Sequence, residues 1–141
     1  MKKQIKCIML ACLTLWMLPM MAGACGVGEQ TADGYENAPI KHAYEHWQQG
    51  VYSPIPFVFL DVRTPEEYQQ GHIKGAKLIP VQVLAKHLAE VPKDKQVYVY
   101  CHAGSRSAKA SKLLAQHGFS NIENVMGGIQ AWKAAGYPVV K

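Results

Sequence analysis

The sequence has 141 residues, 49% of them hydrophobic, and a formal net charge of +5, which fits one globular domain with its own core. Residues 1–24 hold three lysines and no acidic residue, so the charge of the rest of the chain is only +2. A balance this close to neutral excludes the strongly basic surface of a nucleic-acid-binding protein.

Residues 1–24 predict a secretory signal peptide. Three lysines open the segment, residues 8–21 are almost entirely apolar, and Ala22-Gly23-Ala24 forms a small-residue cleavage site. The apolar stretch is too short for a stable membrane span, and an N-terminal anchor that is never cleaved is the alternative. We therefore expect a periplasmic or otherwise exported protein.

Cys25 follows the cleavage site directly, an arrangement that also resembles a bacterial lipoprotein signal with a lipidated cysteine. Ala22 stands where that class usually has leucine, so simple export is favoured, and membrane association is expected only if Cys25 is lipidated. After cleavage only Cys25 and Cys101 remain, which is too few for a disulfide framework. A nearly lone thiol in an oxidising compartment favours a reactive cysteine, although a disulfide between these two would block it.

Residues 25–37 are polar, contain glycine and lack periodicity. They predict a flexible leader before a domain over residues 38–141. A short edge strand over residues 38–40 is expected to open this domain.

Apolar residues at helical spacing then predict a helix that begins at Ile40 and is ended by Gly50. His42 and His46 are four residues apart and share one face of this helix. Because no third ligand lies nearby, they predict solvated surface histidines rather than a metal site.

An apolar run over residues 57–60 predicts a buried strand that ends at Asp61 and Arg63. Residues 64–67 follow as Thr-Pro-Glu-Glu, the pattern of a capping box with proline at the first helical position. This predicts a short helix that stops at Gly71.

The rest of the chain continues to alternate strands with helices. Strands are predicted over residues 77–79, 96–100 and 121–125, and helices over residues 81–90, 107–117 and 127–135. This alternation predicts an α/β domain with a mostly parallel sheet. Ligands of such sheets bind at the carboxyl ends of the strands, where Asp61 and Cys101 both lie.

Cys101 stands where a strand stops and a helix has not yet begun, and the loop after it holds a glycine, two serines and an arginine. Unpaired N–H groups at a helix start attract an anion, so we expect the pKa of this thiol to lie well below about 8.5, the value of a free cysteine. Ser105 and Ser107 could add donors to the site, but Ser107 is expected instead to be the N-cap of the helix. The alternative is a small buried apolar cysteine, for which an anion-binding loop would serve no purpose.

Four blocks of the sequence resemble the single-domain rhodanese family, and together they span about residues 38–140. They are Leu60–Tyr68, Gly71–Ala76 with Pro80, Tyr100–Ser107, and Gly127–Ile129 with Trp132 and residues 136–139. The resemblance implies an α/β fold with a five-stranded, mostly parallel sheet and helices on both faces. It also implies that Cys101 carries sulfur as a persulfide, without a metal or an organic cofactor.

Four residues separate Cys101 from Arg106, as in the sulfurtransferase members that this chain resembles, whereas the related dual-specificity phosphatases have five. We therefore expect transfer of sulfur from thiosulfate or a similar small anionic donor to a thiophilic acceptor such as cyanide or a thiol. The alternatives are a persulfide carrier that delivers sulfur to a periplasmic protein thiol, a phosphatase-like or arsenate-reductase-like enzyme, and a non-catalytic interaction domain. The intact Cys101 argues against the last.

The backbone N–H groups of the loop are expected to bind the persulfide, namely those of His102, Ala103, Gly104, Ser105 and Arg106. Gly104 is expected to supply a backbone angle that other residues resist. Two readings stay open for the side chain of Arg106, which either binds the sulfonate of the donor or supports the loop through a salt bridge. His102 either contacts substrate or faces solvent.

Asp61 and Arg63 also have two interpretations. They line the wall of the substrate pocket, with Arg63 attracting the anionic donor, or they form an ion pair that fixes the loops beneath the site. The second interpretation is favoured.

Overall fold

The computed structural model describes residues 28–141. The predicted signal peptide and Cys25 lie outside these residues. Within the described chain, no helix combines the length and the apolar character needed to cross a membrane.

The centre of the fold is a six-stranded sheet with the strand order β1-β2-β6-β5-β3-β4. Only β1 is antiparallel to its neighbour, and all other pairs are parallel, as expected. The strands are β1 Glu29–Gln30, β2 Glu36–Ala38, β3 Phe57–Asp61, β4 Lys77–Leu78, β5 Gln96–Tyr100 and β6 Ile122–Val125.

The N-terminal edge of the sheet differs from the expectation of five strands after a flexible leader. From residue 28 on, the expected leader adds β1 and begins β2, which lies two residues earlier than the predicted edge strand. β2 ends before Pro39, which has no N–H to donate to a sheet. Strands of two and three residues are too short to show periodicity, so the pattern of the sequence could not reveal them.

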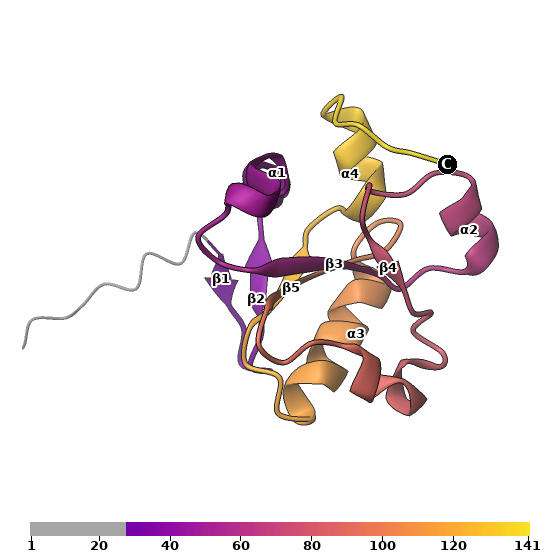
Figure 1. The fold of residues 1–141 in the computed structure, drawn as a ribbon. Helices are drawn as coiled ribbons and strands as arrows, with labels where there is room; N and C mark the ends of the chain where they lie inside the picture. Colours follow the sequence, from indigo (N-terminus) through magenta and orange to yellow (C-terminus); the bar gives the residue numbers. More distant parts are fainter. Residues whose placement is uncertain (1–27) are drawn as a thin grey trace, which may run out of the picture.

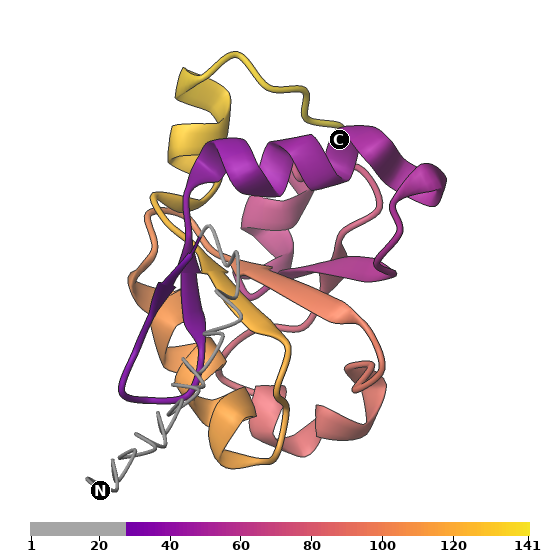
Figure 2. The ribbon, with the colours of Figure 1, turned by 90° about the vertical axis from the view of Figure 1, so that its left-hand side faces the viewer.

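Helices cover both faces of the sheet, as the α/β interpretation requires. Helices α1 and α4 lie on one side of the sheet and α3 on the other (Figure 1, and turned in Figure 2). The C-terminus comes back beside α2, where residues 72 and 140 form an isolated bridge. The helices are α1 Ile40–Gln49, α2 Pro65–Gln69, α3 Ser105–Gln116 and α4 Gly128–Ala134.

The core is divided by the sheet into two clusters, because successive side chains of a strand point to opposite faces. Val97 and Val99 of β5 pack on the side of α3 with Leu114. Tyr98, between them, packs on the other side with Trp132 of α4. Central strand β5 is therefore buried on both faces.

The helix predicted over residues 81–90 is wrong. This connection forms two short 3₁₀ turns, Leu84–Lys86 and Leu88–Glu90, closed by i→i+3 hydrogen bonds. Leu84 is fully buried and Leu88 packs against the same cluster. Two successive 3₁₀ turns place residues four apart on the core much as one α-helical turn does, so the apolar spacing did not distinguish them.

Candidate active site

Cys101 lies directly after β5, and Gly104 turns the chain from the loop into α3. Gly104 has φ +110°, a left-handed conformation that favours glycine, as expected. The helix begins at Ser105, so the prediction that Ser107 is the N-cap is wrong. Because Gly104 starts the helix earlier, Ser107 falls inside the first turn, where its side chain is fully buried.

The first turn of α3 is directed at the sulfur atom of Cys101. The backbone N–H of Gly104 donates to Sγ at 3.1 Å, and the hydroxyl of Ser107 lies 3.4 Å from Sγ. Burial alone would raise the pKa of Cys101, but hydrogen bonds from Ser107, Gly104 and Ala103 outweigh it and lower the pKa. The arrangement therefore stabilises a thiolate.

The first turn of α4 forms backbone hydrogen bonds to the loop from the other side. Ile129 donates its N–H to the carbonyl of Cys101 at 2.9 Å, and Gln130 donates to the carbonyl of His102 at 3.0 Å. Gly128 permits this close approach, because a Cβ there would lie only 2.4 Å from the Cys101 oxygen. The glycine pair in the sequence is therefore needed to bring α4 onto the loop.

Asp61 and Arg63 form an ion pair beneath the site. Both side chains are buried, and Nη2 of Arg63 lies 2.5 Å from Oδ2 of Asp61. The guanidinium also donates to the carbonyls of Gly71 at 2.9 Å and Glu67 at 3.2 Å. Arg63 thereby connects the end of β3 with the middle of α2 and with the turn that follows this helix.

Arg106 is held by Glu67 in α2. Its two terminal nitrogens each lie 2.7 Å from one carboxylate oxygen of Glu67. This bidentate contact, opposed by partial burial, lowers the pKa of Glu67 to about 2. Glu67 also completes the predicted capping box with Thr64, so one carboxylate closes α2 and anchors the loop.

A cavity of about 270 Å³ lies between α2, the loop and α4. Of the substrate-binding residues predicted from the sequence, His102 and Arg63 line it; the Cys101 side chain is 1% exposed and lies beneath the loop. Gln130 and Lys133 of α4 also line the cavity. Sequence reasoning missed both, because only the packing of α4 against the loop brings them there.

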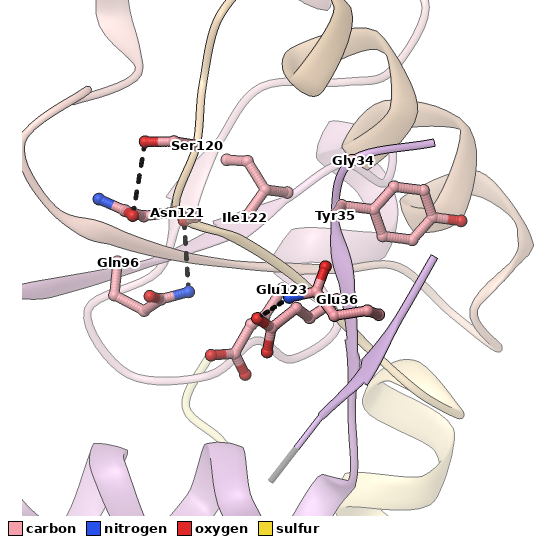
Figure 3. A pocket seen from close by; sticks show the side chains of 9 residues that line it. Gly34, Tyr35, Glu36, Gln96, Ser120, Asn121, Ile122 and Glu123 are labelled. Atoms are coloured by element: carbon pink, nitrogen blue, oxygen red, sulfur yellow. Dashed lines mark hydrogen bonds between the residues drawn. The ribbon is translucent and has the colours of Figure 1, made fainter. Parts of the chain in front are cut away.

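A second cavity, of about 90 Å³, lies at the opposite ends of the strands. Figure 3 shows Glu36 of β2 and Glu123 of β6 close together in it, with Gln96 and Asn121 across from them. Burial, followed by repulsion from Glu36, raises the pKa of Glu123 to about 7. No cysteine is among the residues that line this cavity.

The histidines of α1 are half-buried, so the prediction of solvated surface histidines is wrong; their rings pack against aromatic side chains of β3 and β5. The rings of His42 and His46 lie 4.8 Å apart between centroids. Within residues 28–141, no group of three or more His, Cys, Asp or Glu side chains is arranged to hold a metal ion.

Comparison with known proteins identifies the family. Residues 41–135 match the profile of the Rhodanese-like domain. The chain is 40% identical over 83 residues to a protein named sulfurtransferase from Allochromatium vinosum, covering 59% of this chain and 78% of that protein. It is 38% identical over 87 residues to thiosulfate sulfurtransferase PspE from Escherichia coli, covering 60% and 72%.

A solved structure agrees. The crystal structure of a rhodanese-related protein from Thermoplasma volcanium superposes with a TM-score of 0.66 at 36% identity, covering 74% of this chain and 96% of that one. The match extends through the strands and helices that position the Cys101 loop, since the profile spans residues 41–135. This chain belongs to the rhodanese-like domain family.

Proposed function

We propose that the protein is a sulfurtransferase that carries sulfur on Cys101 as a persulfide. The observation that carries this proposal is the set of donors directed at Sγ, namely the N–H of Gly104 and the hydroxyl of Ser107. They lower the pKa of the thiol despite its burial, and the thiolate is the nucleophilic form of cysteine. The names of the relatives, which include a thiosulfate sulfurtransferase, support the same chemistry.

The reaction is a double displacement. The Cys101 thiolate attacks the outer sulfur of thiosulfate, a new S–S bond forms, the S–S bond of thiosulfate breaks, and sulfite leaves with the electron pair. The persulfide anion that remains carries its charge on the outer sulfur, where we expect the N–H groups of the loop to stabilise it. An acceptor such as cyanide then attacks the outer sulfur, so thiocyanate forms and the thiolate is restored.

The surroundings of Cys101 support a small donor and argue against a phosphatase. Because the side chain is only 1% exposed, a donor must be small enough to reach Sγ past the loop. A phosphatase of this kind would need an arginine free to bind phosphate, whereas Arg106 is engaged by Glu67. The loop spacing of four residues supports the same choice.

The test is to treat the purified protein with thiosulfate and measure its intact mass. We expect the gain of one sulfur atom on Cys101, and thiocyanate when cyanide is added. Cys101→Ser should lose turnover by at least about 10³-fold, as expected for removal of a nucleophile. Cys25→Ser is the matched control and should load normally; unchanged turnover in Cys101→Ser would refute the mechanism.

The same experiment separates turnover from delivery. If thiocyanate forms slowly while a protein thiol removes the sulfur quickly, the protein is a carrier for a partner protein. The predicted signal peptide leads us to propose that such a partner is periplasmic.

A further inference from the structure

The cavity beside the Cys101 loop holds several charged groups, and their pairing decides where an anion can bind. Arg63, Glu67 and Lys133 all line it. A small sulfur donor such as thiosulfate is an anion, so its sulfonate needs a cation or N–H donors that are not already engaged.

The two arginines near the loop are already engaged. Arg63 uses all of its nitrogens on Asp61 and on the carbonyls of Gly71 and Glu67. Arg106 presents both terminal nitrogens to Glu67. Binding a sulfonate at either guanidinium would break an ion pair of the protein's own, one of them fully buried, which is costly.

Lys133 differs from both arginines. It is exposed, and no carboxylate of the described chain lies within ion-pair distance of it. Its ammonium lies beside Gly71, where a Cβ would be 3.5 Å from Nζ, so the side chain reaches across the cavity from α4 towards the end of α2. With both arginines neutralised by carboxylates, this ammonium gives the cavity its net positive charge.

The position of Lys133 relative to the loop is fixed by the backbone. Ile129 and Gln130 donate backbone N–H groups to the carbonyls of Cys101 and His102. Lys133 follows Gln130 by three residues in α4, and both side chains are exposed neighbours on the helix. The exposed side chains of His102 and Gln130 border the same cavity and have N–H groups to offer.

We propose that Lys133, with His102 and Gln130 beside it, forms the subsite that binds the anionic group of the sulfur donor. This inference rests on the proposed sulfur transfer and assigns the role that the sequence had offered to Arg106 and Arg63. The subsite draws the anionic donor to the Cys101 loop before the attack on its outer sulfur, so it acts in loading and not in discharge to an acceptor without net charge.

A structural role for Lys133 is the competing explanation, because it lies in the last turn of α4, where a positive charge favours the helix dipole. Loss of that role would lower stability and would slow loading and discharge alike. Loss of an anion subsite would slow loading alone.

The experiment uses Lys133→Gln, with Lys95→Gln as the matched control. Lys95 is an exposed lysine at the amino end of β5, so both variants remove one positive charge, but from opposite ends of the sheet. We expect the second-order rate of persulfide formation from thiosulfate to fall about tenfold in Lys133→Gln and to stay unchanged in Lys95→Gln. Discharge of preloaded protein to cysteamine, whose attacking form pairs a thiolate with an ammonium and has no net charge, should be equal in both variants. Lys133→Arg should recover most of the loading rate.

Each outcome of this experiment supports or contradicts the anion subsite. Equal loading in the two variants overturns the subsite, and so does a Lys133→Gln variant that slows loading and discharge together with a lower melting temperature. A wild-type protein that takes up no sulfur from thiosulfate is a different failure, because it contradicts the proposed function itself.

Discussion

The two ends of the same parallel strands carry opposite kinds of site. At the carboxyl ends, the buried Asp61 is paired with Arg63, and the neighbouring thiol receives hydrogen bonds. At the amino ends, the buried Glu123 has a carboxylate oxygen without a hydrogen-bond partner and faces a second acid, Glu36. The smaller cavity at the amino ends is lined by these acids, and it would repel the anions that the carboxyl end is suited to bind.

Pairing of buried charges, and not the presence of a cavity, distinguishes the reactive end of this sheet from its other end. At the carboxyl ends every buried charge is compensated, so the thiolate can be stabilised by oriented donors. At the amino ends the contact of Glu123 with His42, at 3.5 Å, does not offset burial, which raises the pKa of the carboxyl group. If the two ends are separate in this sense, a substitution at the amino ends should leave sulfur loading at the carboxyl ends unchanged.

The largest effect is expected for Gly128→Ala at the carboxyl end. The new Cβ would lie 2.4 Å from the Cys101 oxygen and 2.7 Å from the His102 oxygen, so α4 and the loop must move apart. We expect a loss of at least about 3 kcal/mol in the free energy of unfolding. Persulfide formation should fall by at least about 100-fold, because misplacing a site by about 1 Å has an effect of this size.

Gly34→Ala is its control at the amino end. Gly34 also has a positive φ, +85°, but its Cβ would meet only Ala115 at an ordinary 3.6 Å. We expect a cost of about 1 kcal/mol from the backbone conformation and no change in loading. Urea unfolding and mass-monitored loading measure both quantities, and equal losses of loading in the two variants would mean that the ends are not separate.

Glu123→Gln should change the pH dependence of stability. Glu123 has a folded-state pKa of about 7, raised from 4.5, so its contribution is fully present below pH 4.5 and is lost as the pH rises through 7. Its neighbours are Glu36 on β2, Tyr98 on β5 and His42 on α1, whose Nε2 lies 3.5 Å from its Oε2. We expect the wild type to lose about 2 kcal/mol more than the variant between pH 5 and pH 8.

Thermal unfolding at the two pH values measures this difference. Loading from thiosulfate at neutral pH should be unchanged in Glu123→Gln, because the residue lies at the amino ends of the strands. A variant that keeps the wild-type pH dependence of stability would show that burial does not raise the pKa of Glu123.

Glu67→Gln should have the smallest effect on stability, and the pH dependence that it removes should run opposite to that of Glu123. The folded-state pKa of Glu67 is about 2, below 4.5, so the stability that it contributes is present above pH 4.5 and is lost as the pH falls towards 2. Because the pair is partly exposed, we expect the wild type to lose only about 1 kcal/mol more than the variant over this range. Glutamine keeps the capping box, so unfolding followed by circular dichroism from pH 6 to pH 2 reports mainly on the contact with Arg106.

The sequence predicted the local parts of the site well. An apolar strand, a cysteine at its end and a glycine before a helix follow one another within one stretch of the sequence, and the structure has them in that order. The capping box at Thr64 and Glu67 is equally local and is confirmed. Such features depend on spacing and backbone conformation, which a single sequence contains.

What the sequence did not predict depends on contacts between distant segments. Arg106 and Glu67 are 39 residues apart, so their pairing appears only when α2 packs beside the loop. Lys133 reaches the cavity for a similar reason, because α4 is hydrogen-bonded to the loop. Ser107 was close in sequence, but its role depended on where the helix begins, and boundaries shift by one or two residues with the conformation of one glycine.

The burial of Cys101 beneath its loop also controls which oxidants and partner proteins can react with it. A disulfide requires the two Cα atoms to come within about 7 Å, which a folded partner cannot achieve with a thiol that is 1% exposed. The empty thiol is thereby shielded from mixed disulfides with other proteins. Uptake of sulfur lengthens the side chain by an S–S bond of about 2 Å. The persulfide therefore extends further from Cys101 than the thiol does, in the state in which an acceptor must contact it.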